Sequence, residues 1–95
     1  MADAPASVAR EGDAVVFRGA LDRAAVPAVW ARAQPLLAGA KCFDLTAVTT
    51  VDSAGLALLA ELAGRVPGAA LHGEPAGLAD LRAAYRLNPA LGFAA

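Results

Sequence analysis

The sequence has few of the residues that mark secreted, metal-binding or nucleic-acid-binding proteins. Its one cysteine, Cys42, has no partner for an internal disulfide, which suits a reducing compartment. One histidine, one cysteine and scattered acids offer no ligand spacing for a metal. Eight Lys and Arg against nine Asp and Glu give a net charge of −1, and the basic residues stand singly. The chain therefore lacks the basic patch that a nucleic acid or an anionic lipid surface would need.

Targeting signals and long apolar runs are missing as well. Residues 1–7 contain an acid where a signal peptide has basic residues, and no apolar segment follows them. No apolar stretch approaches the roughly 20 residues that cross a bilayer. We therefore expect a soluble cytoplasmic protein with a disordered N-terminus over residues 1–7 and a single domain over residues 8–95.

What the sequence does contain is apolar surface: 58% of its 95 residues are hydrophobic, and many of these are alanine. Alanine favours helices but buries little area, so the core must depend on Leu, Val and Phe. Part of the remaining apolar surface is then available to face a partner protein.

Turn residues and apolar periodicity predict the first half of the domain. A hairpin is expected over residues 7–10 and 14–18, with Gly19 ending its second strand. Asp22 is the predicted N-cap of a helix over residues 24–37, in which Pro27 is tolerated in the first turn. Pro35 removes a backbone donor, so we expect a kink or an early end there.

The second half is predicted as strand, loop, helix, strand and helix. The expected segments are a buried strand over 42–45, a loop over 46–50, a helix over 53–65 and a core strand over 69–72. A last helix follows, with Pro75 in its first turn and an apolar stripe of Leu78, Leu81 and Tyr85. Asn88-Pro89 should stop that helix, leaving Leu91 and Phe93 in a tail that folds back.

The element order ββαβαβα predicts an α/β fold. Strand-helix-strand units require parallel pairing with right-handed crossovers, and the opening hairpin adds an antiparallel edge. The expected architecture is a mixed four-stranded sheet with the helices packed mainly on one face.

The helix over residues 53–65 has two unlike sides when its residues are placed about 100° apart. One side gathers Gly55, Leu56, Leu59, Leu62 and Ala63, and we assign it to the sheet. The other carries small residues and one or two charges: Ser53, Ala54, Ala57, Ala60, Glu61 and Gly64, with Leu58 and Arg65 flanking. A solvent-facing side would carry more long charged side chains. A weakly polar surface of small residues indicates an interface, because a partner's backbone can approach it closely.

The start of this helix has two open interpretations. Asp52 or Ser53 can cap the free amides, and Gly55 removes a side chain from the first turn. A cap is the commonest role of serine at a helix start. The free amides and the helix dipole also favour an anion there, so Ser53 can alternatively belong to a site.

Two motifs resemble those of STAS domains. The segment FDLTAVTTVDSAGLALLAEL, residues 43–62, resembles the signature in which a strand ending in Asp-Leu leads to Asp-Ser/Thr-x-Gly-Leu. Gly19-Ala20-Leu21-Asp22 resembles the Gly-x-Leu-Asp that follows the second strand of such domains. The resemblance covers residues 14–87 and is strongest to the MlaB-like subfamily, through Val29-Trp30, residues 42–45, 55–59 and 71–73, and Tyr85-x-Leu87.

The resemblance implies a non-catalytic subunit without a cofactor. MlaB-like subunits bind and stabilise the MlaF-like ATPase of an ABC phospholipid transporter that also contains an MlaE-like permease and maintains outer-membrane lipid asymmetry. Such a subunit is cytoplasmic and peripheral to the inner membrane. The weakly polar side of the helix over residues 53–65 and the resemblance together give the expected partner-binding residues: Trp30, Asp52, Ser53, Ala54, Ala57, Ala60 and Glu61.

A second function is also implied by the resemblance. Ser53 occupies the position that anti-sigma factor antagonists phosphorylate, so the chain can alternatively be such an antagonist, switched at Ser53. The motif here reads Asp-Ser-Ala-Gly and lacks the second hydroxyl that many antagonists carry.

Several other residues have competing interpretations. Trp30 either packs in the core beside Val26 and Leu37 or anchors the partner, since tryptophan is enriched at interfaces. Ser53, His72 and either Asp44 or Asp52 supply the residue types of a hydrolase triad. However, the serine lacks the first glycine of a nucleophile elbow, and His72 falls in an expected buried strand. We therefore expect no enzyme activity and read Cys42 as an inert buried thiol.

Overall fold

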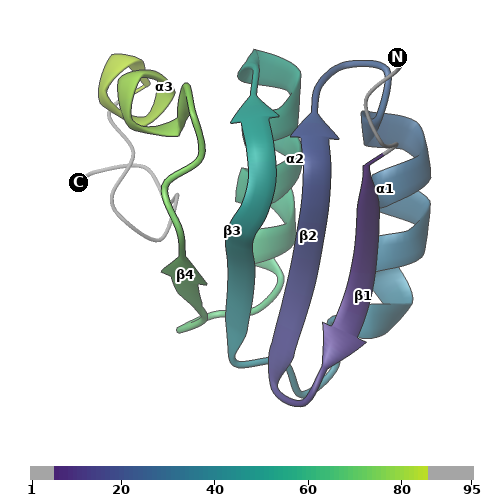
Figure 1. The fold of residues 1–95 in the computed structure, drawn as a ribbon. Helices are drawn as coiled ribbons and strands as arrows, with labels where there is room; N and C mark the ends of the chain where they lie inside the picture. The colour runs from purple at the N-terminus through teal and green to yellow at the C-terminus, as the bar shows by residue number, and fades with distance from the viewer. Residues whose placement is uncertain (1–5, 86–95) are drawn as a thin grey trace.

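The computed structural model describes residues 6–85, which form the predicted α/β fold. A four-stranded sheet has the order β1-β2-β3-β4. Its strands are β1 (Ser7–Glu11), β2 (Ala14–Leu21), β3 (Cys42–Val51) and β4 (Ala70–His72). β1 pairs antiparallel with β2, and the other two pairings are parallel. The mixed sheet and the order ββαβαβα are confirmed (Figure 1).

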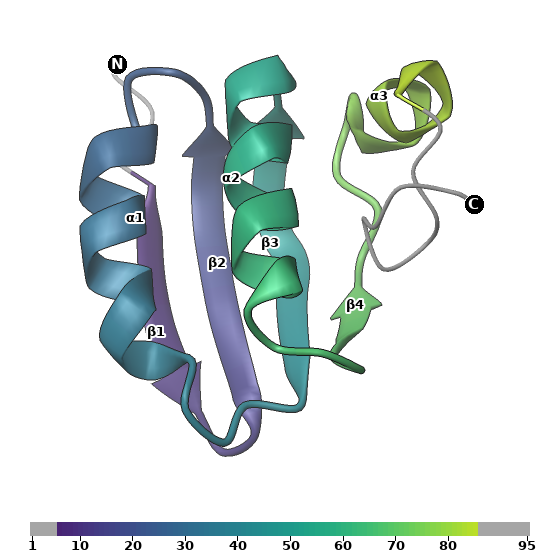
Figure 2. The ribbon, with the colours of Figure 1, turned by 180° about the vertical axis from the view of Figure 1, so that it is seen from behind.

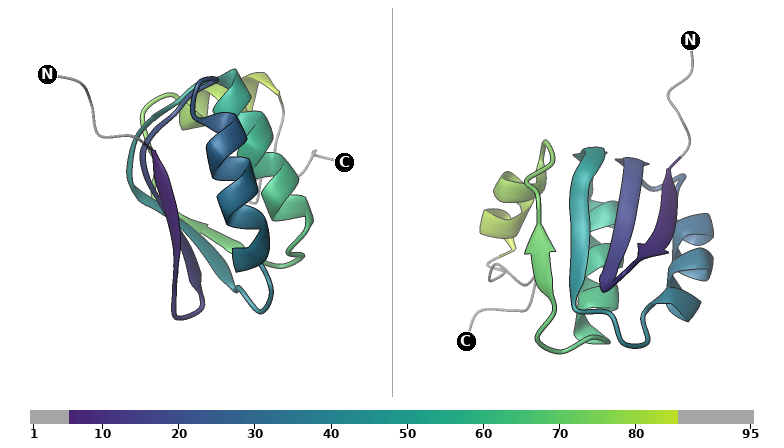
Figure 3. Two further views of the ribbon diagram at one scale, coloured as in Figure 1. Left: turned by 90° about the vertical axis from the view of Figure 1, so that its right-hand side faces the viewer. Right: turned by 60° about the horizontal axis from the view of Figure 1, so that its bottom comes forward.

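Two helices cover one face of this sheet. α1 (Val26–Ala33) continues into the 3-10 turn η1 (Gln34–Leu36), and α2 (Ser53–Gly64) runs beside α1 (Figure 2). α3 (Leu78–Ala84) lies beyond the β4 edge of the sheet (Figure 1). A side view shows α1 and α2 as one layer over the sheet (Figure 3). The core fills the space between these layers; its largest fully buried side chains are Phe17, Phe43, Leu21, Leu45, Leu59, Leu62, Leu78, Val15 and Val29.

The two central strands are longer than predicted. Gly19 does not end β2, and residues 46–50, expected as a loop, belong to β3. The β2–β3 pairing shifts register between Val16 and Arg18 and again between Gly19 and Ala20. At each shift β3 contributes one extra residue, which is the geometry of a β-bulge. The bulges interrupt the apolar-polar alternation along β3. For this reason the sequence pattern of residues 46–50 predicts a loop and not a strand.

α1 begins later and ends earlier than predicted. Its N-cap is Ala25, which makes no side-chain cap bond. Asp22 instead caps the preceding turn, since its Oδ1 accepts the Ala25 amide at 3.0 Å. Pro27 lies in the first turn, and the helix ends at Ala33 where η1 brings in Pro35, both as expected.

The C-terminal part differs more from expectation. β4 is an edge strand rather than a core strand, with Ala70 and His72 exposed. Pro75 precedes α3, whose N-cap is Gly77. Leu78 is fully buried and Leu81 half-buried, but Tyr85 is 51% exposed and does not continue the buried stripe.

Some expectations fall outside the described residues, namely the stop at Asn88-Pro89 and the tail with Leu91 and Phe93. The expected N-terminal tail lies mostly outside them as well, although Ser7 already pairs in β1. Cys42 is half-buried at the start of β3, not fully buried. None of the helices within residues 6–85 is long and apolar enough to cross a membrane.

Candidate functional site

Asp52, and not Ser53, caps α2. Its Oδ1 accepts the Gly55 amide at 2.9 Å, and its Oδ2 accepts the Arg23 amide at 3.1 Å. The Asp52 backbone donates to the Leu21 carbonyl at 3.3 Å. One carboxylate therefore satisfies a free amide of α2 and joins the helix to the turn that follows β2.

Gly55 allows α2 to approach that same turn. A Cβ at this position would lie 2.0 Å from the Leu21 carbonyl oxygen and 2.9 Å from its carbonyl carbon. No side chain larger than hydrogen fits against a backbone group at these distances. The Asp52 and Gly55 positions of the motif are therefore structural, and both act through the end of β2.

Ser53 has no such structural task. It is the first residue of α2 and is exposed. Within residues 6–85 its hydroxyl forms no hydrogen bond, because Asp52 already caps the helix. Of the two interpretations left open by the sequence, the cap therefore belongs to Asp52, and the Ser53 hydroxyl is available to solvent or a partner.

The predicted orientation of α2 is confirmed. The side assigned to the sheet is buried, with Leu56, Leu59 and Leu62 at 3%, 2% and 0% exposure. On the opposite side Ser53, Ala57, Glu61 and Gly64 are exposed, and Ala54 and Ala60 are half-buried. Leu58, expected as a flanking residue, is buried at 4%.

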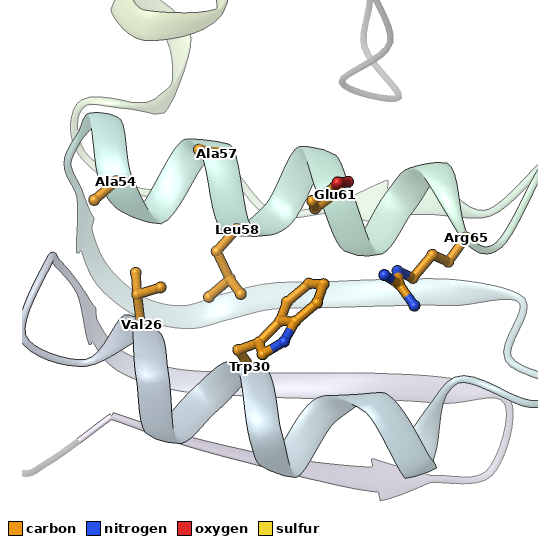
Figure 4. Close-up of a pocket in the computed structure, with 7 residues that line it drawn as sticks. All are labelled: Val26, Trp30, Ala54, Ala57, Leu58, Glu61 and Arg65. Atoms are coloured by element: carbon orange, nitrogen blue, oxygen red, sulfur yellow. The ribbon is translucent and has the colours of Figure 1, made fainter.

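A shallow groove separates α2 from α1. It has a volume of about 420 Å³, and its walls are Val26 and Trp30 from α1 with Ala54, Ala57, Leu58, Glu61 and Arg65 from α2 and its C-cap. Figure 4 shows the Val26, Leu58 and Trp30 side chains reaching into the space between the two helices. Apart from Glu61 and Arg65 at one end, the lining is apolar.

Trp30 has features of both interpretations, a core residue and an anchor for the partner. Its side chain is half-buried and packs against the core, yet it also forms a wall of the groove. The Arg65 guanidinium carbon lies over the indole, 4.9 Å from the ring centroid. Such cation–π contacts stabilise an aromatic side chain in one orientation. Trp30 is thus held at the surface of the groove.

The structure brings most of the predicted partner-binding residues together. Trp30, Ala54, Ala57 and Glu61 line the groove. Asp52 and Ser53 stand at the N-terminal end of the same helix, and Ala60 lies outside the lining, packed against the core.

The groove also contains residues that were not predicted as partner-binding. The sequence predicts Val26 in the core, and Leu58 and Arg65 only at the flanks of the weakly polar side, whereas all three line the groove. Val26 is one helical turn before Trp30, so their spacing was a usable signal. The stacking of Arg65 on Trp30 depends on two helices meeting and had no sequence signal.

Two carboxylates have perturbed acidities. The pKa of Asp52 is lowered, first by the hydrogen bond from the Gly55 amide and further by the Arg23 amide. The pKa of Asp44 is lowered by the Thr46 hydroxyl and amide, which both donate to Asp44 Oδ1. Both groups therefore favour their ionised form through local hydrogen bonds.

The residues of the hypothetical triad are not assembled. Asp44 and His72 pair across β3 and β4, where His72 is exposed, contrary to the expected buried strand. Asp44 lies seven residues before Val51, the last residue of β3, which is about 23 Å along the strand at about 3.3 Å per residue, and α2 starts beyond Val51. Ser53 thus has no histidine beside it. Within residues 6–85 no group of three or more His, Cys, Asp or Glu could hold a metal ion.

Comparisons with known proteins place this fold in a family. The profile described as "Mlab, STAS domain" matches residues 6–92, which is nearly the whole chain. No curated protein sequence matches. Among solved structures, one described as "Crystal Structure Analysis of Mglu" is similar at 26% identity with a TM-score of 0.52. That similarity covers 76% of this chain but 20% of the other, so the chain spans about a fifth of that protein's length. The chain belongs to the MlaB-like STAS domain family.

Proposed function

We propose that this chain is a non-catalytic STAS subunit that binds and stabilises the ATPase of an ABC-type phospholipid transporter. In this proposal it is cytoplasmic and joins the inner membrane only through the transporter, whose permease is MlaE-like and whose work maintains outer-membrane lipid asymmetry. Membership of the MlaB-like family supports the assignment.

One observation supports the proposal most directly: the exposed residues on the outer side of α2 are not needed to hold the fold together, and they form a surface that a partner can contact. Ala57 and Ser53 are exposed, the groove beside them is apolar, and Asp52 performs the capping that Ser53 would otherwise have done. A surface of small residues beside an apolar groove that a half-buried tryptophan lines is typical of a protein interface.

The first test identifies the partner. The chain is purified with an affinity tag in mild detergent, and the proteins that remain bound are identified by mass spectrometry. An ABC ATPase together with a permease supports the proposal. A small histidine-kinase-like ATPase in their place would contradict it and favour the anti-sigma factor antagonist, for which the exposed Ser53 hydroxyl is the supporting observation.

The second test examines the surface itself. Ala57→Arg should abolish binding of the ATPase, because a long charged side chain enters a close contact, while the melting temperature stays within a few degrees of the parent. Ala28→Arg is the matched control, since Ala28 is an exposed alanine on α1 outside the groove. Both variants are assayed by co-purification and by thermal melting. Equal binding by the two variants would contradict the proposed surface.

The third test asks whether Ser53 touches the partner. Ser53→Asp should leave the melting temperature nearly unchanged, because an acid is tolerated in the first turn of a helix. It should weaken ATPase binding sharply, because an uncompensated carboxylate buried against a partner costs several kcal/mol. Ser53→Thr keeps the hydroxyl and should bind well. If Ser53→Asp binds like the parent, Ser53 lies outside the contact.

The absence of enzyme activity is part of the proposal. The supporting observation is that Ser53 lies at the start of α2, apart from the Asp44–His72 pair on β3 and β4. The folded domain should therefore not hydrolyse generic esters. Turnover that disappears in Ser53→Ala would contradict this part.

A further inference from the structure

Glu61 and Arg65 have the spacing of a helix ion pair but do not form one. A glutamate four residues before a basic residue is the favourable order for such a pair. Among residues 6–85, however, the ion pairs within 4.0 Å are Arg18–Glu11 and Arg82–Glu74. Arg65 instead places its guanidinium over Trp30, 4.9 Å from the ring centroid. Figure 4 shows Glu61 on the α2 wall, and Arg65 on the side of Trp30.

Because Arg65 stacks on Trp30, the Glu61 carboxylate stands without an ion-pair partner among the described residues, at the edge of an apolar groove. Arg65, the one cation in the lining within residues 6–85, is stacked on Trp30, and apart from Glu61 the other lining residues carry no charge: Val26, Trp30, Ala54, Ala57 and Leu58. Glu61 is exposed in the free subunit, so water solvates it there. A partner that covers Glu61 removes that water, and a cation on the partner offsets the cost of burying the carboxylate.

The shape of the groove points to a helix as the occupant. Its two walls are helices, whose backbone groups are already paired internally, so an extended peptide would find no strand edge to pair with. A helix, by contrast, packs its side chains into the groove between two others. From Ala54 to Arg65 the α2 wall covers twelve residues, and the eleven steps between them span about 16 Å at about 1.5 Å per residue, which is about three helical turns.

We propose that the groove receives a helix of the partner that carries an apolar side chain between Trp30 and Ala54 and a lysine or arginine that pairs with Glu61. The inference rests on the proposed function and adds the chemistry of the partner segment. Arg65 is a positioning residue: by stacking on Trp30 it holds the indole in the groove wall and leaves Glu61 to the partner.

The main experiment measures the dissociation constant for the ATPase subunit at low and high salt. Glu61→Lys should weaken binding about tenfold or more, because it sets two cations against each other. Glu61→Gln should weaken it less and should reduce the salt dependence. Asp13→Lys makes the same charge change in the β1–β2 turn and should stay within about twofold of the parent, since Asp13 is outside the groove.

A charge-swap scan then identifies the partner's residue. Each surface Lys or Arg of the ATPase is changed to Glu, and the variants are tested against the Glu61→Lys chain. Recovery of binding with one of them supports the proposal. Failure of every swap, or unchanged binding by Glu61→Lys, overturns it. If Ala57→Arg abolishes binding in the same assay, the groove remains the contact surface and only the Glu61 pairing is wrong. If the parent chain does not bind the ATPase at all, the proposed function is wrong as well.

The role of Arg65 is tested separately on the isolated chain. Trp30 is its one tryptophan, so fluorescence reports this groove alone. Arg65→Gln should increase acrylamide quenching of Trp30, because the flat guanidinium no longer covers the ring, with the melting temperature nearly unchanged. Arg65→Lys should give an intermediate value, since it keeps the charge but not the planar stacking. Quenching equal to the parent in both variants would overturn the positioning role.

Discussion

The two sides of α2 differ in the size of their side chains and in how deeply these are buried. Leu59 and Leu62, on the side toward the sheet, are large and are 2% and 0% exposed. Ala57 and Glu61, on the other side, are exposed and line the groove. The core side stabilises the domain through buried area, whereas the exposed residues of the groove side, Ala57 and Glu61, contribute little to stability and are free to be specific for a partner. Stability and binding should therefore be separable by mutation along one helix.

The largest expected effect is at Gly55, where the helix meets the end of β2. Gly55→Ala places a methyl group 2.0 Å from the Leu21 carbonyl oxygen. Because a backbone carbonyl cannot move aside as a side chain can, we expect a loss of about 4 kcal/mol or more in unfolding free energy. Urea denaturation followed by circular dichroism measures it.

The control for this prediction is the other glycine of α2. A Cβ on Gly64 meets no atom within 4 Å, so Gly64→Ala should raise the unfolding free energy by about 0.5–1 kcal/mol through helix propensity. Equal effects of the two substitutions would show that the approach of α2 to β2 is not as close as described.

The next effect concerns the core side of the helix. Leu59→Ala leaves a cavity beneath α2 and should lower the unfolding free energy by about 2–5 kcal/mol. The fraction of the variant that remains folded should still bind the ATPase like the parent, because Leu59 is not part of the groove lining. Titration calorimetry below the melting temperature tests this, and weaker binding by fully folded protein would break the separation of the two sides.

A smaller effect distinguishes Asp52 from its neighbour. Asp52→Ala removes the acceptor for the Gly55 and Arg23 amides and should cost about 1–2 kcal/mol. Ser53→Ala should change the unfolding free energy by less than about 0.5 kcal/mol, as surface substitutions usually do. Chemical denaturation of both variants compares them. The reverse order would return the capping role to Ser53.

The smallest expected effect is a pH dependence. The lowered pKa of Asp52 means that its carboxylate stabilises the folded state above the pKa of the unfolded chain, about 4, and that this contribution is lost as the pH falls through the folded-state value. Asp52→Asn keeps an N-cap acceptor but not the charge. The parent should therefore be more stable than Asp52→Asn at pH 7, and the difference should shrink by pH 3. A constant difference across this range would mean that the charge of Asp52 does not contribute.

The sequence predicted local features well where one residue type has one physical consequence. Pro35 ends α1 because it has no backbone donor, and the apolar spacing of Leu56, Leu59 and Leu62 oriented α2 correctly. The sequence-based prediction failed where the local structure depends on the pairing of two segments. Residues 46–50 form a strand only because β2 extends alongside them and two bulges absorb the mismatch. β4 lies at an edge because no further strand pairs with it in the described sheet.

The candidate site divides in the same way. The sequence alone determined which side of α2 is small and weakly polar, since that follows from helical periodicity, and it placed Asp52, Ser53 and Gly55 at the start of the helix. Only the tertiary structure decided their separate roles, because the Gly55 clash involves the last residue of β2 and one of the Asp52 hydrogen bonds involves the turn after it. It also decided that Arg65 stacks on Trp30 instead of pairing with Glu61, since that choice exists only when α1 lies beside α2.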